Sequence, residues 1–563
     1  MTEFHTGNAA FRWTDTFLRT LQTFGVEHVI ISPGSRSTPL TLAAATNDGL
    51  QKHVILDERS AAFTALGIGK ATNAPAVLIC TSGTALANYY PAVIEARQSG
   101  VPLILATADR PPHLRATGAN QAIDQQKIFG DYPVFYHDVG EPTTANQDLK
   151  RLSMLGQQSV TLAREKRGPV HLNFPFRKPL EPEPQWLNTY QPEGSSLEQA
   201  DTNLTSFTLS EEVQQNISTA KRPLIMVGPL APQDHTKSIG QLASRLGCPI
   251  LAEPSIDHKN TIPGFAGFLR SQAARNTLEP DLILRFGFQP TSKSLEWGLN
   301  EWEPKHHYHF ASTHAWQDAT YSGATHIPWM GKALHFEQLS PSPNSKWLKQ
   351  WRAAEQSFRA FRNNVMEAQS ELTDGAIYDH ITPQLNNEQF MMVSNSFPAR
   401  DINLFGRHQP RTPLYLNRGV SGIDGITSTA IGLSLALDQP GVLVTGDLAF
   451  LHDTNALLNS DNVTQPLTII IINNSGGSIF RMLPVEQHKQ YFRDYFETPQ
   501  TANIQQMAGS YDIPYLGIDT LDELEQLSLP SWMSKHYSLS IIECQTDADA
   551  SMEQRQKLWD YSV

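Results

Sequence analysis

The chain has 563 residues, too many for one hydrophobic core, so we expect about three domains of ordinary size. Its 40% hydrophobic and 18% charged residues are typical of a globular protein. No apolar run reaches the roughly 18 residues needed to cross a membrane. A net charge of -13 argues against a nucleic-acid partner, because a face that binds nucleic acid would be basic.

Cysteine usage and the N-terminal residues indicate the compartment. Cys80, Cys248 and Cys544 lie far apart and have no metal-ligand spacing, so we expect small core residues in a reducing environment. Residues 1–10 lack the basic-then-apolar pattern of a signal peptide. We therefore expect a cytoplasmic protein that does not insert into membranes.

In chain order, the first block alternates short apolar runs with helix-like segments. The runs are β-branched and nearly continuous, which is typical of parallel strands buried on both faces. They stand at residues 26–32, 53–57, 76–80, 101–107 and 170–176. Longer amphipathic segments, such as 59–71 and 85–98, lie between them. This alternation predicts an α/β domain over residues 1–180.

Two further blocks follow the same pattern. The Pro-rich and polar residues 181–200 predict a linker, and residues 338–346 predict a second one. The sequence therefore predicts a central domain over 200–338 and a third domain over 347–563, which begins with a helix-rich stretch at 347–370. The apolar runs expected to form their strands are 223–228, 249–252 and 281–286, then 390–394, 441–445, 467–472 and 539–543.

The sharpest motif lies at the ends of two neighbouring strands of the third block. One strand ends in Gly446-Asp447, and the next ends in Asn473-Asn474 before Ser475-Gly476-Gly477. Ligands of an open parallel sheet bind at the carboxyl ends of its strands. Carboxylate, amide and phosphate oxygens suit Mg²⁺, and glycine lets the backbone approach a diphosphate closely. The alternative is two ordinary strand ends with turn-forming side chains.

Gly-Asp followed at this distance by Asn-Asn resembles the signature of thiamine-diphosphate enzymes. The resemblance implies thiamine diphosphate as cofactor, bound beside Gly446. It also implies Mg²⁺ or Mn²⁺ held by Asp447, the side chain of Asn474 and the main-chain carbonyl of Gly476. Leu448 departs from the glycine that many members have after Gly-Asp, but this change spares the ligand itself.

A second signal lies in the first block, where the run HVILD leads into Glu58 and a helical segment. In thiamine-diphosphate enzymes a glutamate at this strand end binds the aminopyrimidine ring and activates the cofactor, so the resemblance makes Glu58 catalytic. The alternative is a carboxylate that complements a helix dipole. Ile423, in SGIDG, matches the apolar residue that props the two cofactor rings, or is a core isoleucine in a turn.

Four arginines follow predicted strand ends in turn-rich sequence. They are Arg36, Arg110, Arg400 and Arg418. Arginine binds carboxylates through its planar fork, so the set suggests substrates with several carboxylates. Taken singly, each arginine is more often a surface or structural residue.

Longer stretches narrow the family. SPGSRSTPLTLA, DERSAAF, TSGTALANYYPAVIEA, ATADRPP, GANQAI, SNSFPARD and NRGVSGIDG resemble the 2-succinyl-5-enolpyruvyl-6-hydroxy-3-cyclohexene-1-carboxylate synthases of menaquinone biosynthesis. The resemblance covers the first and third blocks and is weak in the middle, apart from PTSKSL, where Ser294 replaces an arginine of some relatives. It implies a transferase that decarboxylates 2-oxoglutarate and adds the succinyl-semialdehyde carbanion to isochorismate.

The same resemblance implies the residues that bind the substrates. Ser396, Arg400 and Arg418 would lie on the 2-oxoglutarate side. The isochorismate side would be formed by Ser35, Arg36, Arg110, Gln121 and Lys293. The family also implies a homodimer or homotetramer whose active sites lie between subunits.

Other functions stay open at this point. The chain could be another thiamine-diphosphate carboligase or decarboxylase, similar to acetolactate synthase, or a non-catalytic subunit that binds the cofactor. No His-His pair lies in the first block, which disfavours simple protonation to an aldehyde. The pair His306-His307, near His309, predicts a solvated polar strand or loop rather than a metal site. A dinucleotide-binding oxidoreductase would have the motif G-x-G-x-x-G after its first strand. No such motif follows the first predicted strand of this chain, which argues against that function.

Overall fold

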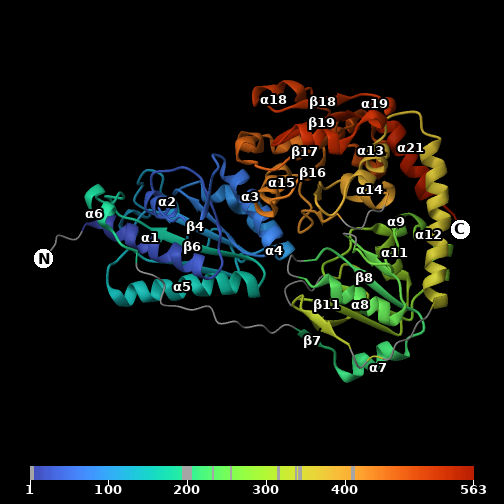
Figure 1. Ribbon diagram of the computed structural model, residues 1–563, viewed down its shortest axis with the longest axis horizontal. Helices are drawn as coiled ribbons and strands as arrows, with labels where there is room; N and C mark the ends of the chain where they lie inside the picture. The colour runs from blue at the N-terminus through green and yellow to red at the C-terminus, as the bar shows by residue number, and fades with distance from the viewer. Residues whose placement is uncertain are drawn as a thin grey trace.

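The computed structural model describes most of the chain and contains three large parallel sheets (Figure 1). The residues described are 5–192, 206–230, 234–253, 256–312, 318–336, 339, 345–407 and 412–562. Every strand pair in the three sheets is parallel, and helices flank the sheets. The predicted α/β class is confirmed. Within the described part of the chain, no helix is long and apolar enough to cross a membrane.

The N-terminal sheet has six strands in the order β2-β1-β3-β4-β6-β5. They are β1 (His28–Ile31), β2 (Gln51–Val54), β3 (Ala76–Cys80), β4 (Leu103–Asp109), β5 (Phe135–Asp138) and β6 (Pro169–Pro175). The helices around it are α1 (Thr6–Thr23), α2 (Thr38–Ala45), α3 (Glu58–Thr72), η1 (Leu86–Tyr89), α4 (Tyr90–Ser99), η2 (Pro112–Leu114) and α5 (Asn146–Glu165). The strand predicted at 53–57 ends earlier, because Asp57 caps α3 by accepting from the Arg59 N–H.

The linker predicted at 181–200 is partly wrong. A short helix, α6 (Pro184–Thr189), lies in it. Trp186 and Tyr190 pack edge-on against Phe11 of α1, with ring centroids 6.1 and 5.4 Å apart. Packing of these partly buried aromatic rings on α1 holds a segment whose composition predicted a loop. Residues 193–200, and most of the predicted linker 338–346, lie outside the described residues.

The central sheet has the order β12-β11-β10-β8-β9. Its strands are β8 (Pro223–Val227), β9 (Ile250–Ala252), β10 (Leu282–Phe286), β11 (His306–Ala311) and β12 (Thr325–Pro328), and β7 (Ser206–Thr208) pairs separately with β13 (Ala333–His335). The helices are α7 (Glu211–Thr219), α8 (Thr236–Leu246), α9 (Phe265–Phe268), α10 (Gln272–Thr277) and α11 (Lys293–Glu301). His307 and His309 are buried in β11, so the prediction of a solvated segment is wrong. Among the described residues, no His, Cys, Asp and Glu cluster could hold a metal ion by itself.

The C-terminal sheet has the order β15-β14-β16-β17-β19-β18. Its strands are β14 (Phe390–Val393), β15 (Leu414–Tyr415), β16 (Gly441–Gly446), β17 (Leu467–Asn473), β18 (Tyr515–Ile518) and β19 (Leu539–Gln545). The first helices of this part are α12 (Ser345–Glu367), α13 (Asp374–Ile381), η4 (Thr382–Gln384), α14 (Pro398–Phe405), α15 (Ile426–Leu437), α16 (Asp447–His452) and η5 (Thr454–Asn462). The later helices are η6 (Ser478–Met482), η7 (Pro484–Gln487), α17 (Lys489–Phe492), η8 (Arg493–Glu497), α18 (Ile504–Ser510), α19 (Leu521–Gln526), α20 (Leu529–Lys535) and α21 (Ala548–Trp559).

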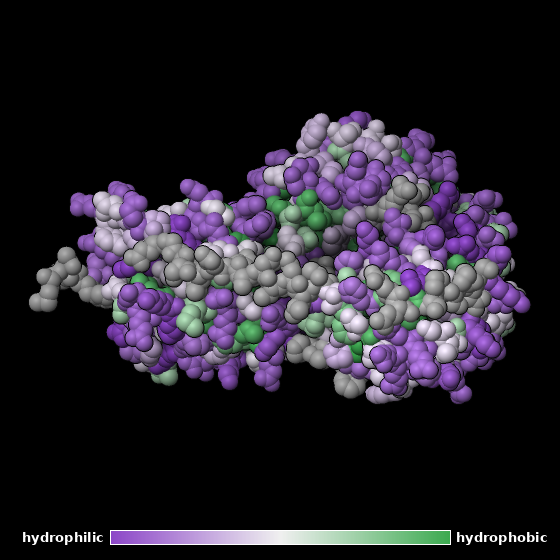
Figure 2. Space-filling model, turned by 60° about the horizontal axis from the view of Figure 1, so that its bottom comes forward, coloured by the Kyte–Doolittle hydropathy of each residue, from purple (hydrophilic) through white to green (hydrophobic). Residues whose placement is uncertain are grey.

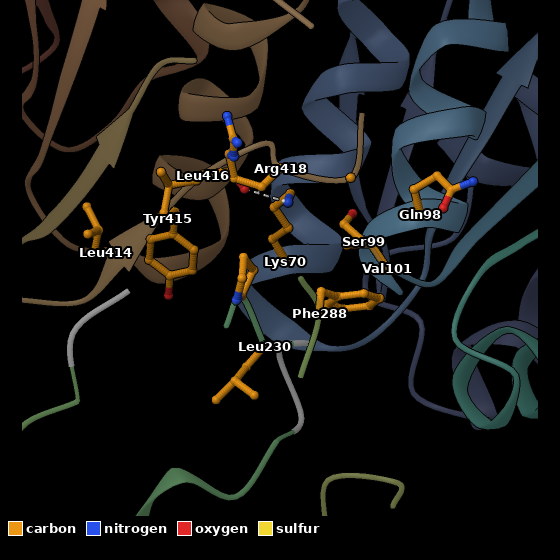
Figure 3. A pocket seen from close by; sticks show the side chains of 12 residues that line it. Lys70, Gln98, Ser99, Val101, Leu230, Phe288, Leu414, Tyr415, Leu416 and Arg418 are labelled. Atoms are coloured by element: carbon orange, nitrogen blue, oxygen red, sulfur yellow. Dashed lines mark hydrogen bonds between the residues drawn. The ribbon is translucent and has the colours of Figure 1, made fainter. Parts of the chain in front are cut away.

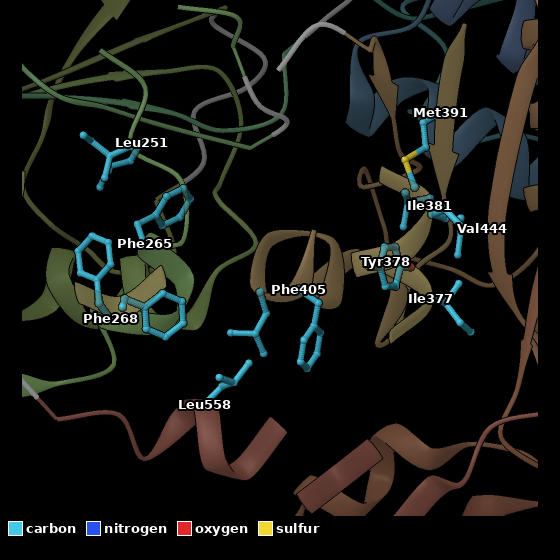
Figure 4. Packing of buried hydrophobic residues seen from close by; sticks show 14 of the residues in the cluster. Leu251, Phe265, Phe268, Ile377, Tyr378, Ile381, Met391, Phe405, Val444 and Leu558 are labelled. Carbon is cyan, nitrogen blue, oxygen red and sulfur yellow. The ribbon is translucent and has the colours of Figure 1, made fainter. Parts of the chain in front are cut away.

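The central and C-terminal parts share one continuous hydrophobic core. It runs from Leu251 and Phe268 in the central part to Phe405 and Val444 in the C-terminal part, with Leu558 of α21 beside them (Figure 4). The N-terminal part has separate cores on the two faces of its own sheet. The three cysteines are buried and unpaired, as predicted.

Helices α3 and α15 join the N-terminal part to the C-terminal part. Two glycines allow the backbones to meet, since a Cβ at Gly67 would lie 2.2 Å from the Thr429 carbonyl oxygen. A Cβ at Gly432 would lie 2.0 Å from the Thr64 carbonyl oxygen. Because Glu58 begins α3, this contact also places Glu58 relative to the C-terminal sheet.

Candidate cofactor and substrate site

Asp447 lies where the sequence places it, directly after β16 and next to the end of β17. Its side chain is 5% exposed. Burial raises the pKa of Asp447 to about 6, against the lowering effect of hydrogen bonds from the backbone of Leu448 and Gly476, and nearby Asp374 raises it further. The hydrogen bond from Gly476 shows that the two halves of the predicted motif meet.

The glycines of the motif serve different purposes. Gly476 has φ +123°, and a Cβ there would lie 2.1 Å from the Glu497 carbonyl oxygen, so only glycine fits. The Gly476 carbonyl accepts from the Ser478 N–H at 2.9 Å and keeps a second lone pair. A Cβ at Gly446 would meet nothing within 4 Å. Open space therefore adjoins Asp447, as a bound diphosphate requires.

The two asparagines that follow β17 point to different partners. Asn473 donates to Glu543 at 2.6 Å, which anchors the loop to the neighbouring strand β19. Asn474 donates through Nδ2 to Asp374 at 3.0 Å, which leaves its Oδ1 oxygen for a cation. One carboxylate, one amide oxygen and one peptide carbonyl form a donor set that suits a hard divalent cation completed by phosphate oxygens.

Glu58 is half-buried at the first turn of α3. Its neighbours tie it to the C-terminal part, because Arg59 donates to the His452 carbonyl at 2.6 Å and Asn455 donates to Asp57 at 2.7 Å. His452 ends α16, the helix that begins at Asp447, and Asn455 lies on η5, which follows it. The loop that carries the half-buried Ile423 ends at Gly425, where a Cβ would lie 1.9 Å from the ring of Phe63, also on α3.

Four of the residues predicted for isochorismate gather at strand ends of the N-terminal sheet. Arg36 is 5% exposed, and it donates to the Phe176 carbonyl at 2.7 Å. Burial and, to a smaller extent, the charge of Arg110 lower the pKa of Arg36 to about 10.

The other residues of this group are Arg110, Gln121 and Ser35. Arg110 donates to the Asn120 carbonyl, and the side chain of Gln121 donates to the Ser82 carbonyl at 3.0 Å. Ser35 is exposed beside Arg36.

The residues predicted for 2-oxoglutarate form a second group, at the end of β14 and after β15. Arg400 donates to the carbonyl of Ser396, which has φ +73°, at 2.7 Å. Arg418 donates to Asn395 at 3.1 Å. Burial lowers the pKa of both arginines, and the charge of Arg400 lowers that of Arg418 further.

Each arginine group also has an unused donor. Within the described part of the chain, the buried Nε atoms of Arg36 and Arg418 have no hydrogen-bond partner. Two like charges held close together, with buried donors free, form a site that an anion would stabilise.

Glu253 is a residue of this site that the sequence reasoning missed. It follows β9, is 4% exposed, and accepts from the backbone N–H groups of Thr291 and Ser292 at 2.5 and 3.0 Å. Its charge raises the pKa of Arg400 and Arg418 against burial. The sequence signal that could have identified Glu253 is its position directly after a predicted strand, at 249–252.

Lys293 lies in the central part, at the start of α11. It directly follows Ser292, whose backbone N–H is held by Glu253. Its ammonium group pairs with Glu296 at 2.5 Å. The structure therefore places Lys293 directly after the loop that Glu253 holds near the Arg400–Arg418 group, and its own side chain is exposed. Ser294, beside it, is buried and shares a hydrogen bond with Ser292.

A cavity of about 120 Å³ lies where the three parts of the chain meet, and Arg418 lines it (Figure 3). Lys70 reaches from α3 to the Leu416 carbonyl at 2.9 Å, and its Nζ lies 3.8 Å from Glu95. Glu95 accepts from the backbone N–H groups of Gly419 and Val420 at 2.9 and 2.8 Å. The N-terminal part thus holds the segment that carries Arg418.

Figure 2 shows apolar surface in the hollow between the N-terminal part and the rest of the chain.

Comparisons with known proteins identify the family of the chain. Three family models match in chain order: the N-terminal TPP-binding domain of thiamine pyrophosphate enzymes at residues 11–128, the middle domain at 179–393 and the C-terminal TPP-binding domain at 401–542. A 2-succinyl-5-enolpyruvyl-6-hydroxy-3-cyclohexene-1-carboxylate synthase of Listeria welshimeri is 36% identical, over 97% of this chain and 96% of its own.

The chain belongs to this synthase family. Synthases of the same name from Haloquadratum walsbyi and a Nostoc species are also 36% identical, over 97% and 91% of this chain and the same shares of their own. The resemblance predicted from the sequence is confirmed. As a member of the synthase family, the protein is a thiamine-diphosphate-dependent transferase. The residues around Asp447 and Gly446 fit that cofactor.

Proposed function

We propose that the protein decarboxylates 2-oxoglutarate and adds the remaining four-carbon fragment to isochorismate in a 1,4-addition. The products are CO₂ and 2-succinyl-5-enolpyruvyl-6-hydroxy-3-cyclohexene-1-carboxylate, an intermediate of menaquinone biosynthesis. The observation that carries the proposal is the presence of two arginine groups, Arg36 with Arg110 and Arg400 with Arg418, in an acidic protein. Both substrates are dianions, so each group can bind one of them.

The cation is proposed to be Mg²⁺, which Mn²⁺ can replace. Asp447, the Oδ1 oxygen of Asn474 and the carbonyl of Gly476 would hold it. The open space beside Gly446 would admit the diphosphate. Support comes from the donor set, because carboxylate and carbonyl oxygens are the ligands that these two metals prefer.

Thiamine diphosphate supplies, when bound, the nucleophilic carbon and the electron sink that decarboxylation needs. Glu58 would form a hydrogen bond with a nitrogen of the aminopyrimidine ring and exchange a proton with it. Ile423 would lie under the two rings and keep them bent. The half-buried positions of Glu58 and Ile423 on adjoining segments support these roles.

Two groups of side chains would orient the substrates. Ser396, Arg400 and Arg418 would bind the carboxylate of 2-oxoglutarate that is retained, and Glu253 would keep the loop before Lys293 beside them. The isochorismate carboxylates would be bound by Ser35, Arg36, Arg110, Gln121 and Lys293. The free Nε donors of Arg36 and Arg418 support this assignment, since a carboxylate would satisfy them.

The proposed assembly is a cytoplasmic homodimer or homotetramer with active sites between subunits. Val54 and Leu56 are 59% and 69% exposed just before Glu58, and Leu458 is 49% exposed on η5. A second copy would cover this apolar surface. We also propose the division of the subunit into domains at 1–180, 200–338 and 347–563.

Product identification by mass spectrometry tests the function. Purified protein is incubated with Mg²⁺, thiamine diphosphate, 2-oxoglutarate and isochorismate, and each component is omitted in turn. We expect a product with the mass of both substrates less CO₂, formed only in the complete mixture. Consumption of pyruvate or another oxo acid in place of 2-oxoglutarate would assign the protein to a neighbouring thiamine-diphosphate reaction.

A further inference from the structure

Asp374 connects the metal-binding loop to the interior of the C-terminal part. It begins α13 and is 1% exposed. Its Oδ2 oxygen accepts from Asn474 Nδ2 at 3.0 Å and from the Arg555 guanidinium at 2.6 Å. Its Oδ1 oxygen accepts from the hydroxyl groups of Thr546 and Ser551 at 2.6 and 3.3 Å. Every one of these contacts comes from a segment distant in sequence.

The contact with Asp374 decides which way the Asn474 amide faces. A carboxylate surrounded by donors only accepts hydrogen bonds, so the NH₂ end of Asn474 must face Asp374. The Oδ1 end is then directed away from it, as a metal ligand requires. A flipped amide would bring two oxygens together and present N–H groups to the cation.

Arg555 keeps Asp374 in place. Its side chain is 1% exposed, lies 3.7 Å above the ring of Phe397 and binds Asp401 as well as Asp374. Asp401 directly follows Arg400 on α14. The two aspartates raise the pKa of Arg555 against burial, so it stays a cation. One buried residue therefore anchors both the loop that carries Asn474 and the helix that carries Arg400.

We propose that Asp374 is a positioning residue, which turns the Asn474 amide oxygen toward the divalent cation and is itself held by Arg555. This proposal rests on the proposed function in one respect, the binding of the cation by Asn474. Partners outside the first set of ligands commonly fix the orientation of those ligands and raise metal affinity. Asp374 contacts neither substrate in this proposal.

The test measures the Mg²⁺ concentration that half-saturates thiamine-diphosphate binding, by calorimetry on the full chain. For Asp374→Asn we expect this concentration to rise about 10- to 100-fold. The matched control is Asp379→Asn, on the same helix, which removes a carboxylate paired with Arg362 and Arg407. It should lower the melting temperature and change the Mg²⁺ requirement by less than about threefold, because it lies outside the site.

A double-mutant cycle separates positioning from a general loss of structure. In an Asn474→Ala background, Asp374→Asn should weaken Mg²⁺ binding by less than about threefold, since the group it orients is gone. Equal effects of Asp374→Asn in both backgrounds would overturn the proposal, as would wild-type Mg²⁺ affinity in the single variant. Wild-type affinity in Asn474→Ala would instead refute the metal ligand, and thus that part of the proposed function.

Thr546→Val is a milder second variant in case Asp374→Asn does not fold. It removes the 2.6 Å hydrogen bond to the other oxygen of Asp374 and keeps the ion pair with Arg555. We expect the Mg²⁺ requirement to rise about threefold or more, again only when Asn474 is present. An unchanged requirement would count against the positioning role.

Discussion

At the scale of single residues, the candidate site is marked by charges held against the cost of burial. Asp447 and Arg36 are buried and Arg418 is half-buried. Burial raises the pKa of Asp447 and lowers the pKa of both arginines, which disfavours the charged form of each. A bound cation would offset this cost for Asp447, and substrate carboxylates would offset it for the arginines. The proposed role of each of these charged residues can therefore be tested by substitution.

Glu58→Gln tests activation of the cofactor. The amide keeps the size of the side chain and a hydrogen bond but cannot exchange the proton, so we expect kcat to fall about 10²- to 10⁴-fold. The affinity for thiamine diphosphate and Mg²⁺, measured by calorimetry, should stay close to that of the wild type. Near-normal turnover of the variant would show that Glu58 does not activate the cofactor.

Arg400→Ala tests recognition of 2-oxoglutarate. Loss of a charge-assisted hydrogen bond should raise the KM for 2-oxoglutarate about 10- to 100-fold, while the KM for isochorismate and cofactor binding change little. Arg407→Ala is a suitable control, because Arg407 is 60% exposed and pairs with Asp379 instead. If cofactor binding is lost together with 2-oxoglutarate binding, Arg400 is a structural residue.

At the scale of elements, the contact between helices α3 and α15 fixes the position of Glu58 relative to the C-terminal part. α3 begins at Glu58, α15 follows the loop of Ile423, and glycines at their crossing let backbone meet backbone. Close packing of this kind leaves little room for an added atom. The crossing should therefore be sensitive to a single methyl group.

Gly67→Ala should force α3 and α15 apart, because the new Cβ would meet the Thr429 carbonyl at 2.2 Å. We expect a loss of about 1–3 kcal/mol in stability and a lower kcat, as Glu58 moves with its helix. Thermal unfolding and steady-state kinetics measure both. Gly509→Ala on α18, where a Cβ meets nothing within 4 Å, should be neutral or slightly stabilising. An unchanged melting temperature for Gly67→Ala would contradict the role of the crossing.

The sequence predicts the strands and the motif at their ends well, because both are local patterns. The runs at 76–80 and 441–445 become β3 and β16 almost residue for residue. Glu253 follows a strand, but its role and that of Asp374 could not be assigned in this way, since their partners, Thr291 and Asn474, are distant in sequence. Helix α6 was missed because its stability comes from packing of Trp186 on α1 rather than from composition.

At the scale of the whole molecule, the hydrophobic cores group the three parts of the chain into two unequal units. The central and C-terminal parts share a hydrophobic core, whereas the N-terminal part has its own. The two units are joined by α3 against α15 and by Glu95, which holds the segment of Arg418. The residues proposed to bind the cofactor are divided between these units, and in the proposed oligomer they would meet across the contact between two subunits.

Subunit mixing tests that dependence. Glu58→Gln and Asp447→Ala should each be inactive, since one lacks cofactor activation and the other a metal ligand. If the site lies between subunits, a dimer of one Glu58→Gln chain and one Asp447→Ala chain has one intact site and one doubly altered site. After equal mixing and exchange about half of the dimers are mixed, so about a quarter of wild-type activity should return. Native mass spectrometry confirms the exchange. Mixed dimers with no activity would place the whole site within one chain.

The most direct test of the central claim is to follow the carboxyl carbon of 2-oxoglutarate. The protein is supplied with 2-oxoglutarate labelled with ¹³C at C1, isochorismate, Mg²⁺ and thiamine diphosphate, and both gas and product are analysed by mass spectrometry. We predict one labelled CO₂ for each unlabelled adduct of the four-carbon fragment with isochorismate. Labelled CO₂ with free succinic semialdehyde, and isochorismate left unchanged, would show a decarboxylase and contradict the account.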